Sequence, residues 1–439
     1  MTGKLCLMLS MAVLAVSPTK ALRASDGGLS ADEARIVAWV DANTDRAIDQ
    51  LEEIVNINSG TLNIPGVRAV GDVLSGEFSD LGFRTRWEDL PPEMKRAGHL
   101  HAERAGSRGK RVLMIGHLDT VFEPDHPYQR MIRDGNLARG PGALDMKGGD
   151  IAILYALKAI ASVGGLDDTT IRVIFTGDEE RPGSPKEISR ASLIDAARRS
   201  DVALGFESGS RDGPQHYAVV ARRSASSWRL ETSGRQGHSS RIFSEELGSG
   251  AIFEAARILN AFHQELGGEP YLTFNAGVIL GGTNVSFDGA TSQGTAYGKG
   301  NVVPQTAVVT GGIRTLTVEQ LDSARARMRS IVAAHHPGAE ASISFTEGYP
   351  PMSPSDGNTS LLGLLNEINR DLDAPQMEAF DPGLRGAADI SFAAPHVDAA
   401  LAGLGSFGRG SHSPDEYTEL DLMPLVIKRT ALLVYRLTR

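Results

Sequence analysis

Imidazole and carboxylate side chains stand after four short apolar segments of this sequence. The segments and the residues that follow them are RVLMIG (111–116) before His117 and Asp119, TIRVIFTG (170–177) before Asp178, Glu179 and Glu180, DVALGF (201–206) before Glu207, and ALAGLG (400–405), with a glycine-rich loop, before His412. Imidazole nitrogens and carboxylate oxygens bind zinc-like divalent ions, and a carboxylate can also serve as a general base. Two histidines and three carboxylates would hold two such ions, with one carboxylate bridging them, so the set predicts a site for two divalent metal ions.

A further acid, Asp145, stands in the glycine-dense stretch RGPGALDMKGG (139–149), directly before the helix-like run DIAILYALKAI (150–160). Glycine permits backbone conformations and close approaches that other residues resist. We therefore expect Asp145 to be placed near a helix N-terminus against something that needs tight access. A carboxylate that bridges two metal ions meets that description.

Each of these residues has a plainer explanation when it is taken alone. His117 could be a hydrogen-bonded histidine at a strand end, residues 178–180 a solvated turn, Glu207 a helix-start acid, Asp145 a helix N-cap and His412 a loop histidine. Their shared position favours a site, because sites in open α/β sheets form beyond the carboxyl ends of the strands.

The elements that must position these side chains are strands and helices in alternation. RVLMIG is uninterrupted, as expected for a strand buried on both faces, and helix-like segments alternate with it and the other apolar segments. We predict an α/β catalytic domain, with a mostly parallel sheet and flanking helices, over residues 31–220 and 346–439. Two amphipathic helices and about four strands predict a smaller inserted α+β domain over 221–345.

Length and charge exclude some classes of protein. A chain of 439 residues is too long for one hydrophobic core, so two domains are expected. The net charge of -10 and the lack of any basic run argue against nucleic acid or an anionic membrane surface as a partner. No membrane anchor is predicted.

The N-terminus has the layout of a secretory signal peptide. Lys4 precedes the apolar run 5–16, and small residues surround Ala21, which predicts a leader over residues 1–21 and a periplasmic or secreted protein. The run is too short to span a bilayer, and the alternative is a buried N-terminal helix. The single cysteine, Cys6, would leave with the leader, so any metal site must use His, Asp and Glu.

Seven motifs together resemble the M20 metallopeptidases, a family with two co-catalytic zinc ions. In chain order between about Ile57 and Tyr417 they are GHLDTV, GPGALDMKGG, TGDEE, GFESG, GRQGHSSR, GNVVP and GSHSPDEY. The forms INSGT and GFESG are most similar to the glutamate-carboxypeptidase branch.

The resemblance implies a role for each matching residue. One zinc would be held by His117, Asp145 and Glu207, and the other by Asp145, Glu180 and His412. Cobalt or manganese would also suit these ligands. Asp119 would orient His117 by a hydrogen bond, and Glu179 would be the general base. The resemblance also implies that the inserted domain is a lid and dimerisation domain, from which His238 of the neighbouring subunit in a homodimer would help to bind the substrate carbonyl.

The chain departs from the family pattern at three places that flank the substrate. Gly312 replaces the usual Asp two residues before Arg314, Gly250 replaces an Asn after His238, and RGAAD (385–389) replaces a GG-x-S/T-D loop. Arg314 is the first candidate to bind a substrate carboxylate, because an arginine fork matches a carboxylate, and Arg385 is the second. The alternative for Arg314 is a surface arginine at a strand end.

The resemblance implies a glutamate-carboxypeptidase-like enzyme that cleaves the amide bond next to a C-terminal amino acid in a small peptide. An N-acyl amino acid deacylase is the main alternative, since it would cut the same type of bond with the same metal ligands. A metal-binding protein without catalysis is a remote alternative, which the presence of Glu179 disfavours.

Overall fold

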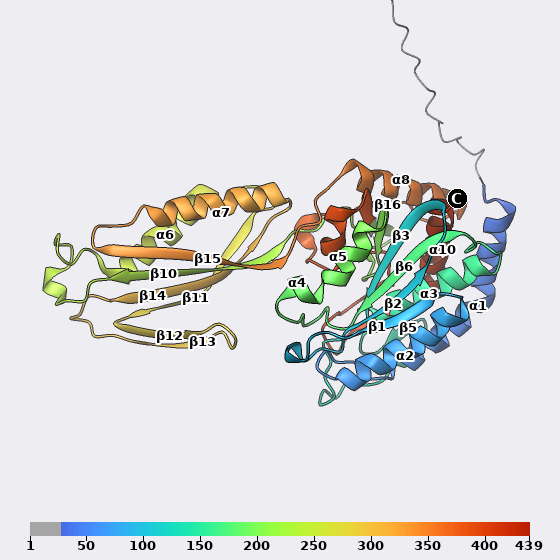
Figure 1. Ribbon diagram of the computed structural model, residues 1–439, viewed down its shortest axis with the longest axis horizontal. Coiled ribbons are helices and arrows are strands. Elements are labelled where there is room, and N and C mark those ends of the chain that lie inside the picture. The colour runs from blue at the N-terminus through green and yellow to red at the C-terminus, as the bar shows by residue number, and fades with distance from the viewer. Residues whose placement is uncertain (1–27) are drawn as a thin grey trace, which may run out of the picture.

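The computed structural model describes residues 28–439, so the predicted leader over 1–21 lies outside the described residues. The described chain forms two parts that stand side by side along the long axis of the molecule (Figure 1). The larger part contains both ends of the described chain, and the smaller part is built from the middle of it.

The larger part is organised around a six-stranded sheet with the order β1-β2-β6-β3-β7-β17. Strands β6, β3, β7 and β17 are parallel to one another, and β2 and β1 extend one edge in antiparallel orientation. The bounds are β1 (Arg84–Glu88), β2 (His99–Arg104), β3 (Arg108–His117), β6 (Thr169–Thr176), β7 (Val202–Gly205) and β17 (Ala399–Leu401). This arrangement confirms the predicted α/β class with a parallel-rich sheet.

The second half of the central strand β3, from Val112 onward, is buried on both faces, which explains the apolar run in its sequence. Val112 and Met114 belong to one hydrophobic core, while Leu113 and Ile115 belong to a second core on the opposite face. The first core is covered by long helices, α1 (Ala31–Val55), α2 (Ile64–Asp80), α3 (Lys147–Ala161), α8 (Asp356–Asp371) and α10 (Met423–Leu437). The second is covered by shorter ones, α5 (Ala191–Arg198) and α9 (Ile390–Ala393), while α4 (Lys186–Ser189) precedes α5.

Local sequence signals begin several of these helices. Ser30 caps α1 through a capping box with Glu33, in which each side chain bonds the other residue's main-chain N–H. Ser355 caps α8 by accepting from the N–H of Asn358. These caps supply partners for N–H groups that the first helical turn leaves free.

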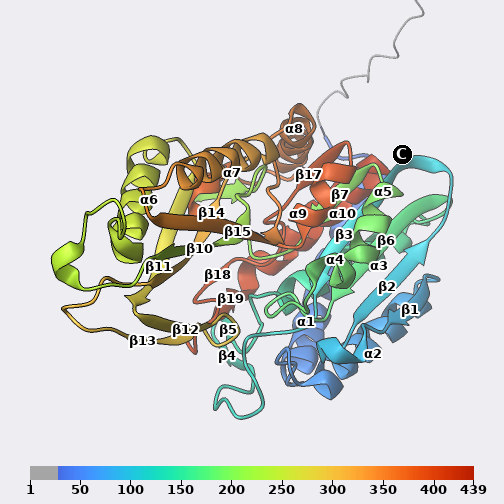
Figure 2. The same cartoon turned by 60° about the vertical axis from the view of Figure 1, so that its left-hand side comes forward.

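The smaller part is an antiparallel sheet with the order β11-β14-β10-β15, covered by two helices (Figure 2). It has its own core, which includes Trp228 and Phe262. Its elements are β10 (Ala225–Gly234), α6 (Gly250–Leu266), β11 (Thr273–Gly282), β14 (Thr306–Arg314), α7 (Val318–Ala333) and β15 (Ala339–Tyr349), with a separate hairpin of β12 (Asn284–Asp288) and β13 (Gln293–Tyr297).

The chain passes between the two parts twice, and the two passages pair with each other. The N–H of Arg222 donates to the carbonyl of Met352 at 2.9 Å, and the reverse bond measures 3.0 Å. The first residue of β10, Ala225, lies opposite the last residue of β15, Tyr349. We call the paired segments 221–225 and 349–352 the crossing ribbon.

Two small sheets complete the larger part. They have the orders β18-β19-β5-β4 and β16-β9-β8. The strands are β4 (Ile132–Asp134), β5 (Leu137–Arg139), β8 (Ser210–Asp212), β9 (Gln215–Ala218), β16 (Met377–Ala379), β18 (Gly408–Arg409) and β19 (Tyr417–Glu419). No helix within residues 28–439 is both long and apolar enough to cross a membrane.

Candidate metal centre

The carboxyl ends of the central strands bring the metal-binding candidates together. β3 ends at His117, β6 is followed by Glu179 and Glu180, and β7 is followed by Glu207. A cavity of about 300 Å³ lies at this edge. Its lining includes Asp145, Glu179, Glu180, Glu207, Arg385 and His412.

Asp145 lies between the two candidate histidines and presents one carboxylate oxygen to each. Its Oδ1 lies 3.3 Å from Nε2 of His117, and its Oδ2 lies 3.2 Å from Nε2 of His412. Oε2 of Glu180 lies 3.0 Å from the same nitrogen of His412. A carboxylate with one oxygen on each side has the arrangement expected of a bridging ligand.

The loop around Asp145 is fixed by buried polar contacts. Oε1 of Glu416 accepts from the N–H groups of Leu144 and Asp145 at 2.9 and 3.1 Å. The buried Lys147 ammonium donates to the carbonyls of Ile54 and Ile57 at 2.9 and 3.0 Å, which ties the start of α3 to the end of α1. The absence of a side chain at Gly149 then allows the start of α3 to lie directly against the main chain of Phe206.

Gly149 shows how close that approach is. A Cβ built on it would lie 2.0 Å from the main-chain oxygen of Phe206, the residue before Glu207. The glycine-dense stretch therefore places Asp145 and Glu207, which lie on different segments, around one cavity.

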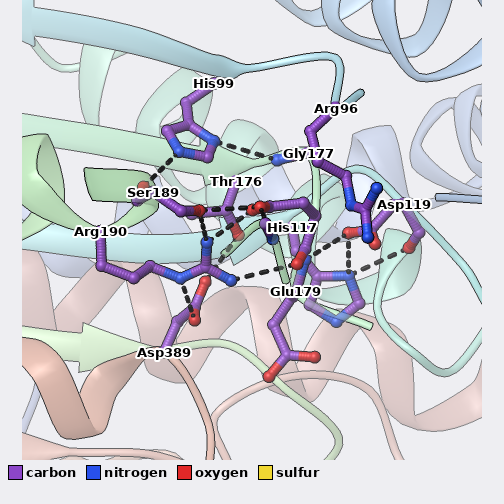
Figure 3. Close-up of polar contacts among 12 residues, drawn as sticks. Arg96, His99, His117, Asp119, Thr176, Gly177, Glu179, Ser189, Arg190 and Asp389 are labelled. Carbon is purple, nitrogen blue, oxygen red and sulfur yellow. Dashed lines mark hydrogen bonds and ion pairs between the residues drawn. The ribbon is translucent and has the colours of Figure 1, made fainter. Parts of the chain in front are cut away.

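Asp119 is fully buried and joins three parts of the site. Its Oδ1 accepts from the N–H of Glu179 at 2.9 Å, and its Oδ2 accepts from the N–H of Glu180 at 3.1 Å. Its carboxylate lies 3.5 Å from Nδ1 of His117, and its main-chain oxygen lies 3.0 Å from that nitrogen. Asp119 therefore contacts the His117 ring, as the resemblance implies, and it also holds the loop that carries the two glutamates (Figure 3).

Two arginines border the cavity on the side of Glu207. Nη2 of Arg222 donates to Oε2 of Glu207 at 3.0 Å, and Nη1 of Arg222 donates to the carbonyl of Gly386 at 2.9 Å. Arg385 donates to the main-chain oxygen of Ser208 at 2.5 Å. Burial, and then the positive charge of Arg222, lower the pKa of Arg385. The lining of the cavity is thus acidic where the metal-binding candidates lie and basic beside it.

The protonation preferences at the centre show that it is short of positive charge. Bonds to the carboxylates of Asp145 and Glu180 raise the pKa of His412 to about 11. Burial alone would lower the pKa of His117, yet Asp119 and Asp145 raise it well above its ordinary value. Burial and the negative charge of Glu207 raise the pKa of Glu179. A bound cation would relieve this excess of negative charge.

The residues present fit divalent metal ions. Nε2 of His117 and Oε1 of Glu180 are buried, and within residues 28–439 neither has a hydrogen-bond partner. Ligand atoms of His117, Asp145 and Glu180 lie within 4.8 Å of one another, and so do those of His117, Glu179 and Glu207. The donors are imidazole nitrogens and carboxylate oxygens without sulfur, which suits zinc, cobalt or manganese.

Two of the predicted substrate-binding residues lie elsewhere. His238 and Arg314 are exposed on the smaller domain, and neither is among the described residues that line the cavity. Nδ1 of His238 lies 2.8 Å from the hydroxyl of Ser240, and Arg314 ends β14 opposite Thr273. Of the three residues predicted to contact substrate, the structure brings only Arg385 to the cavity.

Sequence reasoning missed Arg222 and Glu416 as parts of the site. Glu416 lies inside the motif GSHSPDEY, so its distance from His412 was a usable signal. Arg222 follows a strand-like run in a segment without any chemical motif, and only the crossing ribbon brings it to Glu207.

Comparison with known proteins gives concordant matches. The profile of Peptidase family M20/M25/M40 matches residues 113–436. Carboxypeptidase G2 of Pseudomonas sp. (strain RS-16) is 27% identical over 395 residues, covering 88% of each chain. Succinyl-diaminopimelate desuccinylase of Ralstonia nicotianae is 27% identical over 330 residues, covering 70% of this chain and 79% of the relative. The crystal structure of aminopeptidase PepT from Bacillus cereus superposes with a TM-score of 0.68 at 17% identity, covering 90% of this chain and 99% of that one.

Proposed function

The chain belongs to Peptidase family M20/M25/M40, and from this premise we propose that it is a two-metal carboxypeptidase that cleaves the amide bond next to a C-terminal amino acid. Its membership makes it a hydrolytic enzyme that acts on amide bonds. The observation that carries the proposal is the position of Asp145 between His117 and His412, with Glu179 lining the same cavity.

His117, Asp145 and Glu207 would hold one ion, and Asp145, Glu180 and His412 the other. Two bound divalent ions, which we propose to be zinc, would supply Lewis-acid activation of water and of the scissile carbonyl. Glu179 takes a proton from the attacking water and then gives it to the leaving amine. Its position supports this role, because Glu179 lines the same cavity as Asp145, Glu180, Glu207 and His412.

Arg385 is the residue we assign to the substrate carboxylate. It lines the cavity beside Glu207, and it belongs to the loop in which this chain departs from the family pattern. A guanidinium presents parallel N–H groups to a carboxylate, and its partial burial strengthens that interaction. The similarity to carboxypeptidase G2 supports a substrate with a free C-terminal carboxylate.

An N-acyl amino acid deacylase is the second candidate, and the similarity to succinyl-diaminopimelate desuccinylases supports it. Both activities use the same centre, so only substrates distinguish them. A panel of dipeptides and N-acyl amino acids that share one C-terminal residue would rank the two. A carboxypeptidase should cleave free dipeptides well and their C-terminal amides poorly, and equal cleavage of amides would refute the carboxypeptidase assignment.

The general-base role of Glu179 is tested by Glu179→Gln. The amide keeps the size of the side chain but cannot take a proton, so kcat should fall by about 10²–10⁴-fold with metal content unchanged. Glu187→Gln makes the same chemical change at an exposed position eight residues further along and should leave kcat unchanged. Wild-type activity in Glu179→Gln would refute the mechanism and favour a metal-binding role without this chemistry.

We also propose export to the periplasm or the medium and assembly as a homodimer. The signal-peptide layout of residues 1–21 supports export, and sequencing of natively produced protein should find a first residue near Leu22. The exposed edge strand β11 of the smaller domain supports pairing, since an unpaired edge offers free N–H and C=O groups. Light scattering that gives the monomer mass at micromolar concentration would contradict the dimer.

A further inference from the structure

Each segment of the crossing ribbon contributes one side chain that contacts a glutamate of the candidate metal centre. Arg222, on the first segment, binds the Glu207 carboxylate, as described above. Tyr349, on the second segment, donates its phenolic O–H to the main-chain oxygen of Glu179 at 3.1 Å. The proposed general base is thus in direct contact with the segment that returns from the smaller domain.

The main chain of Glu179 is held from both ends. Its N–H donates to the buried carboxylate of Asp119 at 2.9 Å, and its C=O accepts from Tyr349. Fixing both ends of a residue leaves only the side-chain torsions free. The position of the carboxylate in the cavity therefore depends on both contacts.

The buried side chain of Arg190 contacts both Asp178, the residue before Glu179, and Tyr349. Arg190 is fully buried, and its Nη1 donates to Oδ1 of Asp178 at 2.5 Å while its Nη2 donates to the main-chain oxygen of Asp178 at 3.2 Å. Its Nε donates to Asp389 at 2.7 Å (Figure 3). Nη2 also lies 3.5 Å from the hydroxyl oxygen of Tyr349. Because Arg190 donates to that oxygen, the hydroxyl proton of Tyr349 is directed toward the main-chain oxygen of Glu179.

The ring of Tyr349 is also fixed by packing. It lies against Phe392 with 5.1 Å between ring centroids. Removal of the hydroxyl alone therefore leaves the ring in place and deletes the bond to Glu179 together with the longer contact to Arg190. Tyr349 is not among the residues that line the 300 Å³ cavity, so a change there does not remove a substrate contact.

We propose that Tyr349 is a positioning residue for Glu179, which fixes the main chain of the general base from the crossing ribbon. The inference rests on the proposed function, because it takes Glu179 as the base. It assigns to Tyr349 an effect on the chemical step and none on substrate binding.

The test is Tyr349→Phe in the metal-loaded enzyme. We expect kcat to fall about 5- to 50-fold, with KM within twofold and metal content unchanged, because a misplaced base slows proton transfer without changing the binding surface. Tyr217→Phe is the matched control, since the ring of Tyr217 packs against Phe380 much as that of Tyr349 packs against Phe392. The control should retain wild-type kcat.

A double-mutant cycle separates positioning from a general structural effect. Glu179→Asp already withdraws the carboxylate, so adding Tyr349→Phe should lower kcat by clearly less than it does in the wild type. The same factor in both backgrounds would overturn the proposal, and so would a Tyr349→Phe kcat within twofold of wild type. Activity of Glu179→Gln alone tests the proposed function, so the two can fail separately.

Discussion

The contact between Gly149, at the start of α3, and the main chain of Phe206 predicts how alanine at this position changes the free energy of unfolding. Gly149 and Gly76 are both helical glycines with negative φ, in α3 and α2 respectively. A Cβ on Gly149 would lie 2.0 Å from the main-chain oxygen of Phe206, whereas a Cβ on Gly76 would have no atom within 4 Å. The two positions therefore share a helical backbone and differ in the space available.

Alanine at either position restricts the unfolded chain and favours the helix by about 0.5–1 kcal/mol. At Gly76 nothing opposes this gain. At Gly149 the new methyl meets a main-chain oxygen that no rotamer change can move, so the upper part of the usual overpacking cost, about 1–3 kcal/mol, applies. We expect Gly76→Ala to be more stable than wild type by about 0.5–1 kcal/mol and Gly149→Ala to be less stable by about 1–2 kcal/mol.

Urea unfolding followed by circular dichroism measures both changes as shifts of the midpoint. Gly149→Ala should also bind metal more weakly, because Phe206 precedes the predicted ligand Glu207, while Gly76→Ala should bind metal normally. If Gly149→Ala unfolds at the same urea concentration as Gly76→Ala, the close approach of α3 to Phe206 does not limit stability and this reasoning is refuted.

Three further predictions test other parts of the structure. Burial and a neighbouring arginine lower the pKa of His216 to about 4. Between pH 6.5 and 4 the unfolded state therefore binds more protons than the folded state, so the melting temperature should fall as the pH falls through this window. The variant His216→Gln should show a weaker pH dependence. Elemental analysis should give two metal equivalents for the wild type, fewer than one for Asp145→Ala and close to one for His412→Ala, and unchanged stoichiometry in Asp145→Ala would refute a bridging role. Arg385→Ala should lower kcat/KM for substrates with a free carboxylate by about 10- to 1000-fold, whereas Arg314→Ala should have kcat/KM near the wild-type value. A larger loss in Arg314→Ala than in Arg385→Ala on the same substrates would place the carboxylate-binding residue on the smaller domain.

Three of the candidate residues could be grouped from the sequence because they follow the strands of the main sheet directly. RVLMIG, TIRVIFTG and DVALGF are mostly apolar, and the structure shows why for β3, whose alternate residues from Val112 to Ile115 enter two different cores. Once such strands are parallel, residues directly after them meet at one edge of the sheet. His117, Glu180 and Glu207 could therefore be grouped before any distance was known.

Residues that act across the two domains could not be predicted in the same way. Arg222 and Tyr349 reach the centre only because the crossing ribbon runs beside it, and neither stands after a strand of the main sheet. Arg314 illustrates the converse: a family motif identifies it, yet its place relative to the cavity depends on how the smaller domain sits. Sequence patterns report local structure, whereas the relative placement of two folded parts depends on contacts between distant segments.

The pairing of Arg222 with Met352 also has a consequence for how the chain folds. The segment between them is a closed loop of about 130 residues, and the larger domain has to bring 28–220 and 353–439 together across it. Closing a disordered loop of that length costs about 2 kcal/mol more than closing one of ten residues, because the entropy loss grows with the logarithm of length. The inserted sheet has its own core, so its folding brings the two ends together in advance and removes most of this cost. A version in which a short turn replaces residues 226–348 should therefore fold more readily than one in which a flexible linker of the original length takes their place.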